Sequence, residues 1–188
     1  LERFIQIIKI YKPSFVVRVT GDCPLIYPEF IDKQINILRE QEADLVKITH
    51  DCGLLSGQGV ISSRALIHIN LNSLDRNDLE HVGSLYLMKN PNKFRWVGLN
   101  IPQEFNKRDY RVTVDETEDL ELIRSIYSDL WDGKNIIAFQ SLLNWFDINH
   151  LKLKINSKVK DSKINQTVRK IKKNLQQKLV CTYEWDDI

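Results

Sequence analysis

Residues 14–26 of the chain read SFVVRVTGDCPLI. The first half of this stretch is a short run of β-branched and aromatic residues that ends at Gly21, which predicts a buried strand. Apolar residues at helical spacing over residues 2–11 predict a helix before this strand, and Pro13 ends it. A second helix is predicted to open at Pro28, because proline suits the first turn of a helix.

The same alternation of helices and strands continues along most of the chain. Further strands are predicted at residues 43–49, 94–99 and 110–114. Further helices are predicted at residues 63–70, 78–89, 117–130 and 136–146, and residues 50–59 are predicted to form a loop. Strands separated by helices favour an α/β sandwich, with a mostly parallel sheet and helices on both faces.

Composition narrows the class of protein. The chain has 188 residues, of which 43% are hydrophobic and 28% charged, as in an ordinary globular domain. No apolar run approaches the roughly 18–20 residues that a membrane-spanning helix needs. Three scattered cysteines are too few for a disulfide framework, so we expect a reducing, cytoplasmic location.

Charge divides the chain into two predicted parts. Residues 1–150 form a partial α/β domain with 17 Lys/Arg and 21 Asp/Glu, whereas residues 151–188 carry ten Lys/Arg and four Asp/Glu. We predict that this basic C-terminal tail is helical or disordered, with Trp185 exposed or facing a partner. A basic tail on an acidic body is not the pattern of a nucleic-acid-binding domain, and we expect neither a nucleic-acid nor a membrane partner.

Two segments of similar sequence each lead into an aspartate. Residues 18–22 read RVTGD and residues 111–115 read RVTVD. Ligands of open α/β sheets bind beyond the carboxyl ends of strands, and Mg²⁺ is usually held there by one or two carboxylates together with phosphate oxygens and water. Asp22 and Asp115 are therefore candidate metal ligands. The alternatives are an ordinary turn at Asp22 and a favourable charge at a helix N-terminus for Asp115.

Residues 18–26, RVTGDCPLI, resemble the signature of the cytidylyltransferases related to the SpsF-like spore-coat polysaccharide proteins and to the acylneuraminate and KDO enzymes. Further landmarks follow in that family's order over about residues 1–130. They are Ala43-Asp44, Val60-Ile61-Ser62 with Ala65-Leu66, Glu80-His81-Val82, Asn90-Pro91-Asn92-Lys93-Phe94, and residues 111–115 with Glu118-Asp119-Leu120-Glu121.

The resemblance implies a Rossmann-like nucleotidyltransferase fold and a Mg²⁺-dependent reaction. In that reaction CMP is transferred from CTP to a sugar acid and pyrophosphate is released. The reaction serves the synthesis of cell-surface polysaccharide. Asp22 and Asp115 match the family's metal-binding aspartates, and Arg111 is expected beside them, holding a phosphate or a sugar carboxylate. Arg18, Glu80 and His81 are expected to bind substrate. A homodimer is also expected, because related enzymes are often dimers.

The sequence also departs from the family pattern. The family's N-terminal segment, with its basic phosphate-binding loop, would lie before Leu1, so we expect this chain to be part of a longer protein and incomplete as an enzyme. Gly59 replaces an acidic residue and Leu79 replaces an arginine. These departures leave two alternatives: a degenerate, non-catalytic relative that binds a nucleotide or a partner protein, and a nucleotide-sugar glycosyltransferase of similar fold.

Overall fold

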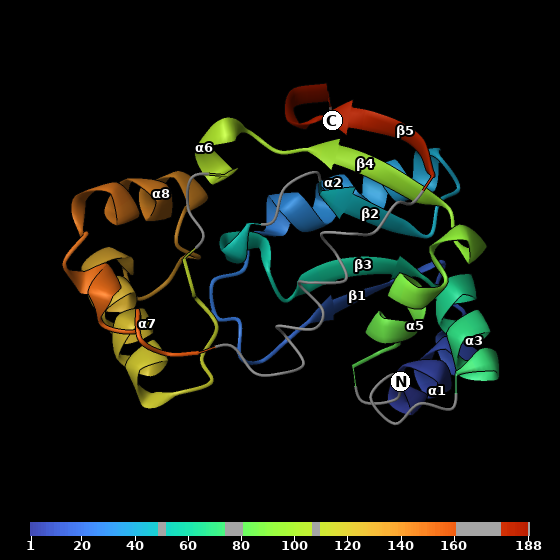
Figure 1. Ribbon diagram of the computed structural model, residues 1–188, viewed down its shortest axis with the longest axis horizontal. Helices are drawn as coiled ribbons and strands as arrows, with labels where there is room; N and C mark the ends of the chain where they lie inside the picture. Colours follow the sequence, from blue (N-terminus) through green and yellow to red (C-terminus); the bar gives the residue numbers. More distant parts are fainter. Residues whose placement is uncertain (49–51, 74–80, 107–109, 161–177, 188) are drawn as a thin grey trace.

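A computed structural model describes residues 1–48, 52–73, 81–106, 110–160 and 178–187 (Figure 1). Within these residues, five strands form one sheet in the order β1-β3-β2-β4-β5. Their bounds are β1 (Phe15–Val19), β2 (Leu45–Ile48), β3 (Gln58–Ser62), β4 (Trp96–Asn100) and β5 (Leu179–Glu184). β3 is antiparallel to both β1 and β2, whereas β2, β4 and β5 pair in parallel, so every strand except β3 runs in one direction.

Helices cover both faces of this sheet. On one face lie α1 (Glu2–Tyr11), α3 (Ser63–Asn72) and α5 (Ser84–Lys89), and on the other lies α2 (Pro28–Glu40). Successive side chains of a strand point to opposite faces of the sheet, so one strand contributes to the hydrophobic core on each face. Ile61 of β3 packs with α1 and α3, whereas Val60 packs with α2. The predicted fold class, a mostly parallel sheet between helices, is confirmed.

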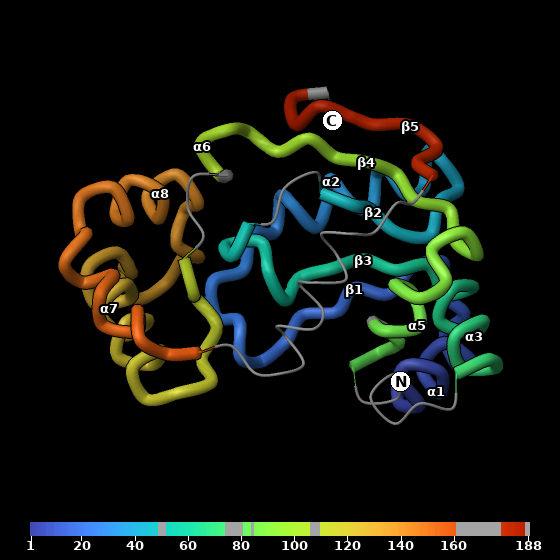
Figure 2. The backbone as a smooth tube through the Cα atoms, in the orientation of Figure 1, coloured from blue at the N-terminus to red at the C-terminus, as the bar shows by residue number. Residues whose placement is uncertain are grey.

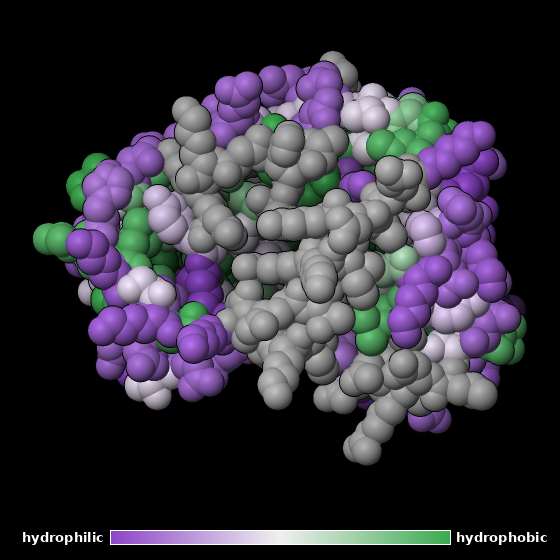
Figure 3. All heavy atoms as spheres, in the orientation of Figure 1, coloured by the Kyte–Doolittle hydropathy of each residue, from purple (hydrophilic) through white to green (hydrophobic). Residues whose placement is uncertain are grey.

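Two further helices stand at one end of the strands. α7 (Thr117–Leu130) and α8 (Phe139–Ile148) pack on each other and share the hydrophobic core of α2. The short α6 (Gln103–Asn106) lies between β4 and these helices in the chain. Figures 1 and 2 show that β4 and β5 run toward this end of the molecule, while α1, α3 and α5 lie at the opposite end. Hydrophobic atoms reach the surface where α7 and α8 lie (Figure 3).

Most of the predicted elements are confirmed, and two predictions are wrong. The last two residues of the predicted loop at residues 50–59 belong to β3, a strand in the interior of the sheet, and residues 50 and 51 lie outside the described part of the chain. The predicted strand at residues 110–114 is irregular, because its Val114 N–H donates to the Asp22 carbonyl and not to a sheet strand. The predicted helix at residues 78–89 is present as α5 in its second half, and residues 74–80 lie outside the described part of the chain.

The described parts of residues 151–188 do not form a separate tail. The turn η3 (Lys152–Lys154) packs against α7, and β5 pairs in parallel with β4. β5 forms because partly buried and exposed residues alternate along it, as they do in a strand with one covered face. Residues 161–177 of the tail predicted to be helical or disordered lie outside the described residues.

The chain end beyond β5 also packs on the domain. The Trp185 ring lies 6.0 Å from Tyr27 and 5.2 Å from Phe105, centroid to centroid. Lys33 Nζ lies 5.1 Å from the centre of the same ring and donates to the Trp185 carbonyl at 2.7 Å. The expectation that Trp185 is exposed is therefore wrong. Among the described residues, none of the helices has the length and apolar character to cross a bilayer.

We predict that Trp185→Ala lowers the free energy of unfolding by about 2 kcal/mol, because the ring loses its aromatic contacts and the apolar area it covers. Val180→Ala is the matched control, since Val180 lies in β5 with 45% of its surface exposed and should change stability little. Urea denaturation measures both variants. Equal losses in the two would contradict the docking of the chain end.

Candidate functional site

Asp22 follows the carboxyl end of β1 in a tight turn. The Cys23 N–H donates to the Thr20 carbonyl at 3.1 Å, and the Thr20 N–H donates to the Gly57 carbonyl at 2.9 Å. Gly57 has a φ of 72°, and a Cβ added there would lie 2.2 Å from Cys23 Sγ, so only glycine allows this close approach. The turn is thereby clamped between β1 and the loop before β3, and Asp22 is exposed at its tip.

One backbone hydrogen bond joins this turn to the segment that carries Asp115. The Val114 N–H donates to the Asp22 carbonyl at 2.7 Å. The buried Cys23 thiol lies near both aspartates: burial raises the pKa of Cys23, and the negative charges of Asp22 and Asp115 raise this pKa further. The structure therefore brings together the two aspartates that the sequence singles out, although they stand 93 positions apart in the chain.

Arg111 lies beside Asp115 but binds mainly to Asp119. Its Nε lies 2.8 Å from Asp119 Oδ1, and its Nη2 donates to Asp119 Oδ2 at 2.8 Å and to Asp115 Oδ2 at 2.5 Å. The hydrogen bonds from Arg111 to Asp119 are the main reason why the pKa of the guanidinium is raised. Thr113 Oγ1 lies 3.2 Å from Asp115 Oδ2 and donates to it. Arg111 is thus a partner of both carboxylates.

Asp119 lies in the first turn of α7, and its side chain has no exposed surface. Besides Arg111, it accepts hydrogen bonds from the backbone N–H groups of Asp115 and Glu116, both at 3.1 Å, and from Asn156 Nδ2 at 2.8 Å. Burial alone would raise the pKa of this carboxyl, but the hydrogen bonds from Arg111, Asn156 and the backbone together lower it. Asp119 is therefore a buried, ionised anchor.

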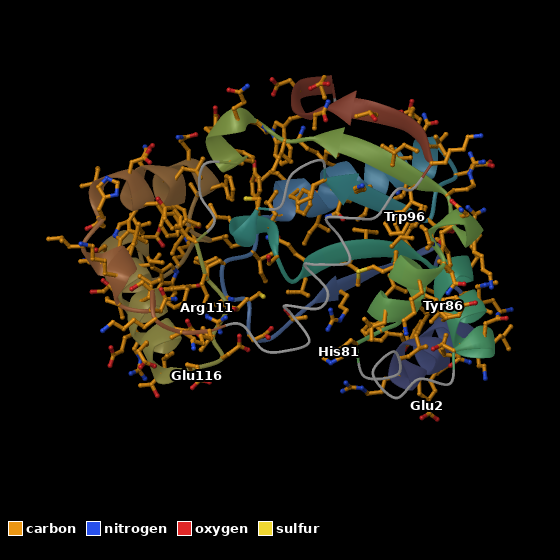
Figure 4. All side chains as sticks on the ribbon, viewed as in Figure 1. Glu2, His81, Tyr86, Trp96, Arg111 and Glu116 are labelled. Atoms are coloured by element: carbon orange, nitrogen blue, oxygen red, sulfur yellow. The ribbon has the colours of Figure 1, made fainter. Side chains whose placement is uncertain are left out.

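The remaining predicted site residues lie elsewhere or outside the described residues. Arg18 lies in β1, and its positive charge contributes, after burial and Arg3, to lowering the pKa of the Leu1 amino group. His81 lies on the α5 side of the sheet, apart from Arg111 and Glu116 beside α7 (Figure 4). Glu80 is outside the described part of the chain. The substrate-binding roles of Arg18, Glu80 and His81 stay predictions.

The carboxylates of Asp22 and Asp115 suit a hard cation that takes its remaining ligands from phosphate and water. In the described residues, no cluster of three or more His, Cys, Asp or Glu side chains is arranged to hold a metal. Two neighbouring, exposed carboxylates, Asp22 and Asp115, are nonetheless the kind of set with which proteins bind Mg²⁺, because phosphate oxygens and water fill the other positions. Asp22 and Asp115 therefore fit Mg²⁺ bound together with a nucleoside triphosphate.

Two residues that support this site, Asp119 and Asn156, were not predicted as site residues from the sequence, although Asp119 lies in the family landmark Glu118-Asp119-Leu120-Glu121. Asp119 could have been found, because an acidic residue three positions after Glu116 suits a capping box, which the structure contains at the start of α7. Asn156 carries no comparable signal, since its contacts are with Arg111 and Asp119, 45 and 37 positions away.

Comparison with known proteins places the sequence among cytidylyltransferases. The sequence model of the Cytidylyltransferase family matches residues 1–143. The spore coat polysaccharide biosynthesis protein SpsF of Bacillus subtilis is 33% identical over 147 residues, which are 77% of this chain and 60% of that protein. An uncharacterized protein of Methanocaldococcus jannaschii is 31% identical over 162 residues, 85% of this chain and 64% of its own length. The chain thus spans less than two thirds of these relatives.

A solved structure supports the fold independently. The structure of a cytidylyltransferase from Leptospira borgpetersenii superposes with a TM-score of 0.71 over 85% of this chain and 66% of that chain. Because the two sequences are 22% identical, this likeness concerns the fold alone.

We predict that Asp119→Asn lowers the free energy of unfolding at pH 7 by about 3 kcal/mol, because it leaves the Arg111 guanidinium without its buried charge partner. The pKa of Asp119 is lowered in the folded chain, so its stabilising effect is present above the ordinary aspartate pKa of about 4 and is lost as the pH falls below it. The stability difference between wild type and Asp119→Asn should therefore shrink below about pH 4.

Urea denaturation between pH 7 and pH 3 measures this difference. The matched control is Glu118→Gln, the same kind of change at an exposed neighbour in the same turn of α7, which should alter stability by less than about 0.5 kcal/mol. A stability difference for Asp119→Asn that stays constant over this pH range would contradict an ionised, buried Asp119.

Proposed function

The chain belongs to the cytidylyltransferase family, and on this basis we propose that the protein transfers CMP from CTP to a sugar acid, with Mg²⁺, in the synthesis of a cell-surface polysaccharide. The observation that supports the proposal is the hydrogen bond from the Val114 N–H to the Asp22 carbonyl, which joins the turn of Asp22 to the segment that carries Asp115, near Cys23. The name of the B. subtilis relative supports the polysaccharide context.

In this proposal Asp22 and Asp115 hold the metal ion. Asp115 presents one oxygen, Oδ2, to Arg111 and Thr113, and 43% of its side chain is exposed, so the carboxylate is oriented and still open to a ligand. Asp22 is exposed at the tip of its clamped turn. Bound Mg²⁺ would offset the negative charge of the triphosphate.

The proposed reaction is an in-line displacement at the α-phosphorus of CTP. The sugar hydroxyl oxygen bonds to that phosphorus, the bond from the phosphorus to pyrophosphate breaks, and the hydroxyl proton passes to solvent. Positioning contributes much of the rate in such reactions, which is why a fixed carboxylate pair matters. We propose that Arg111 orients Asp115 through its Nη2 and contributes positive charge near the phosphates.

Other parts of the proposal rest on family resemblance. Arg18, Glu80 and His81 are proposed to bind the substrate. A homodimer and a cytoplasmic location are proposed on the same ground. Because the chain spans less than two thirds of its curated relatives, the complete reaction is proposed for the whole protein, and the metal carboxylates are the part that these residues supply.

We predict that CTP binds this chain only when Mg²⁺ is present and that Asp22→Asn weakens this binding about tenfold or more, because one metal ligand is lost. Isothermal titration calorimetry of CTP, with and without Mg²⁺, measures the affinity. Asp32→Asn is the matched control, since Asp32 is an exposed aspartate of α2, outside the site, and should leave the affinity unchanged.

Three outcomes would overturn the proposal. They are CTP binding that does not require the metal, equal effects of Asp22→Asn and Asp32→Asn, and no binding to a chain shown to be folded. Tighter binding of a preformed nucleotide sugar than of CTP would favour a glycosyltransferase instead.

A further inference from the structure

Asn156 connects the segment after α8 to the candidate site. It lies just beyond η3, in the part of the chain that follows the family match, and only 5% of its surface is exposed. Burying an amide is costly unless its donors and acceptors are paired, so its partners show what holds it there. Asn156 Nδ2 donates to two groups that both belong to the site: the Arg111 carbonyl at 2.9 Å and Asp119 Oδ1 at 2.8 Å.

These two hydrogen bonds act on the same arginine from two sides. Asn156 Nδ2 holds the backbone of Arg111 directly, and it holds Asp119, which in turn binds the guanidinium of Arg111 through both carboxylate oxygens. The Arg111 side chain is only 14% exposed. Backbone and side chain of Arg111 are therefore both fixed by groups that Asn156 contacts.

The chain of contacts ends at a proposed metal ligand. Arg111 Nη2 donates to Asp115 Oδ2 at 2.5 Å, and Asp119 Oδ2 accepts from the backbone N–H of Asp115 at 3.1 Å. The position of the Asp115 backbone and the rotation of its carboxylate thus depend on Asp119 and Arg111. Outer partners of this kind set the orientation of a metal ligand and commonly change metal affinity when they are removed.

We propose that Asn156 is a positioning residue for Asp115, acting through Asp119 and Arg111, and that residues 149–160 are consequently part of the functional site. This inference rests on the proposed function as far as the metal is concerned. Asn156 touches neither the proposed metal nor the substrate, and its contribution is the orientation of the carboxylate that does.

The test compares the Mn²⁺ affinity of wild type and variants of the full chain. Electron paramagnetic resonance measures this affinity, and Mn²⁺ serves as a probe for the proposed Mg²⁺ site. Asn156→Ala and Asn156→Leu should each weaken Mn²⁺ binding by roughly 10–100-fold, the range common when an outer partner of a metal ligand is removed. Asn156→Leu nearly keeps the size and branching of the side chain, so it removes the donor without opening a large cavity or adding a charge beside Asp119, and it serves if the alanine variant does not fold.

Asn149→Ala is the matched control. Asn149 lies in the same segment, and its Nδ2 donates to the Trp145 carbonyl at 3.0 Å, within the end of α8. This variant should keep wild-type Mn²⁺ affinity. Urea denaturation of all variants separates a loss of metal binding in a folded chain from a general loss of structure.

A second measurement needs no metal. The Arg111 Nε–H, which donates to Asp119, should be protected from exchange with solvent in ¹⁵N NMR spectra of the wild type and of Asn149→Ala, and should lose that protection in Asn156→Ala. If the wild type binds no Mn²⁺, the proposed function fails and this exchange decides the positioning role alone. Unchanged Mn²⁺ affinity, or unchanged exchange, in a folded Asn156 variant would overturn the inference.

Discussion

The buried carboxylate of Asp119 is the constraint on which the candidate site depends. An ionised carboxylate removed from water is costly unless charged and hydrogen-bonding partners surround it. The side chain of Asp119 has no exposed surface, and its partners come from three places in the chain: Arg111, the start of α7, and Asn156. Satisfying one buried charge therefore fixes the segment before α7, the first turn of α7 and the segment after α8 in a single arrangement. The proposed metal ligand Asp115 lies within that arrangement, so its position follows from the same requirement.

The sheet delivers the other half of the site. β1 ends in the turn that exposes Asp22, and Gly57, just before β3, closes over that turn because it has no side chain. The hydrogen bond between Val114 and Asp22 then joins the turn to the Asp115 segment. Both segments lie toward the end of the sheet where α7 packs (Figure 1). Open α/β sheets bind ligands beyond the carboxyl ends of their strands, which lie at this end of the sheet. Membership of the cytidylyltransferase family agrees with a ligand site there.

The sequence predicted those elements whose apolar residues recur with one clear period. α7 was predicted with its observed bounds, since its apolar residues recur at helical spacing over 14 residues. β3 was missed because Gln58 and Gly59 resemble loop residues, although the strand pairs on both sides. β5 was missed because its six alternating residues follow a long polar stretch. In the site, Asp22 and Asp115 followed from a repeated pattern and a family resemblance. The role of Asn156 could not follow from either, because its contacts depend on the folded path of the chain.

We propose that Asp22 and Asp115 together form one metal site. The most direct test is anomalous X-ray diffraction from crystals of the chain grown with Mn²⁺ and CTP, in which Mn²⁺ stands in for Mg²⁺. We expect one Mn²⁺ peak bonded at about 2.1 Å to a carboxylate oxygen of Asp22 and to one of Asp115, with phosphate oxygens of CTP among its other ligands. A nucleotide-bound metal ion that contacts neither aspartate, or that contacts one of them while the other points away, would contradict a shared metal site.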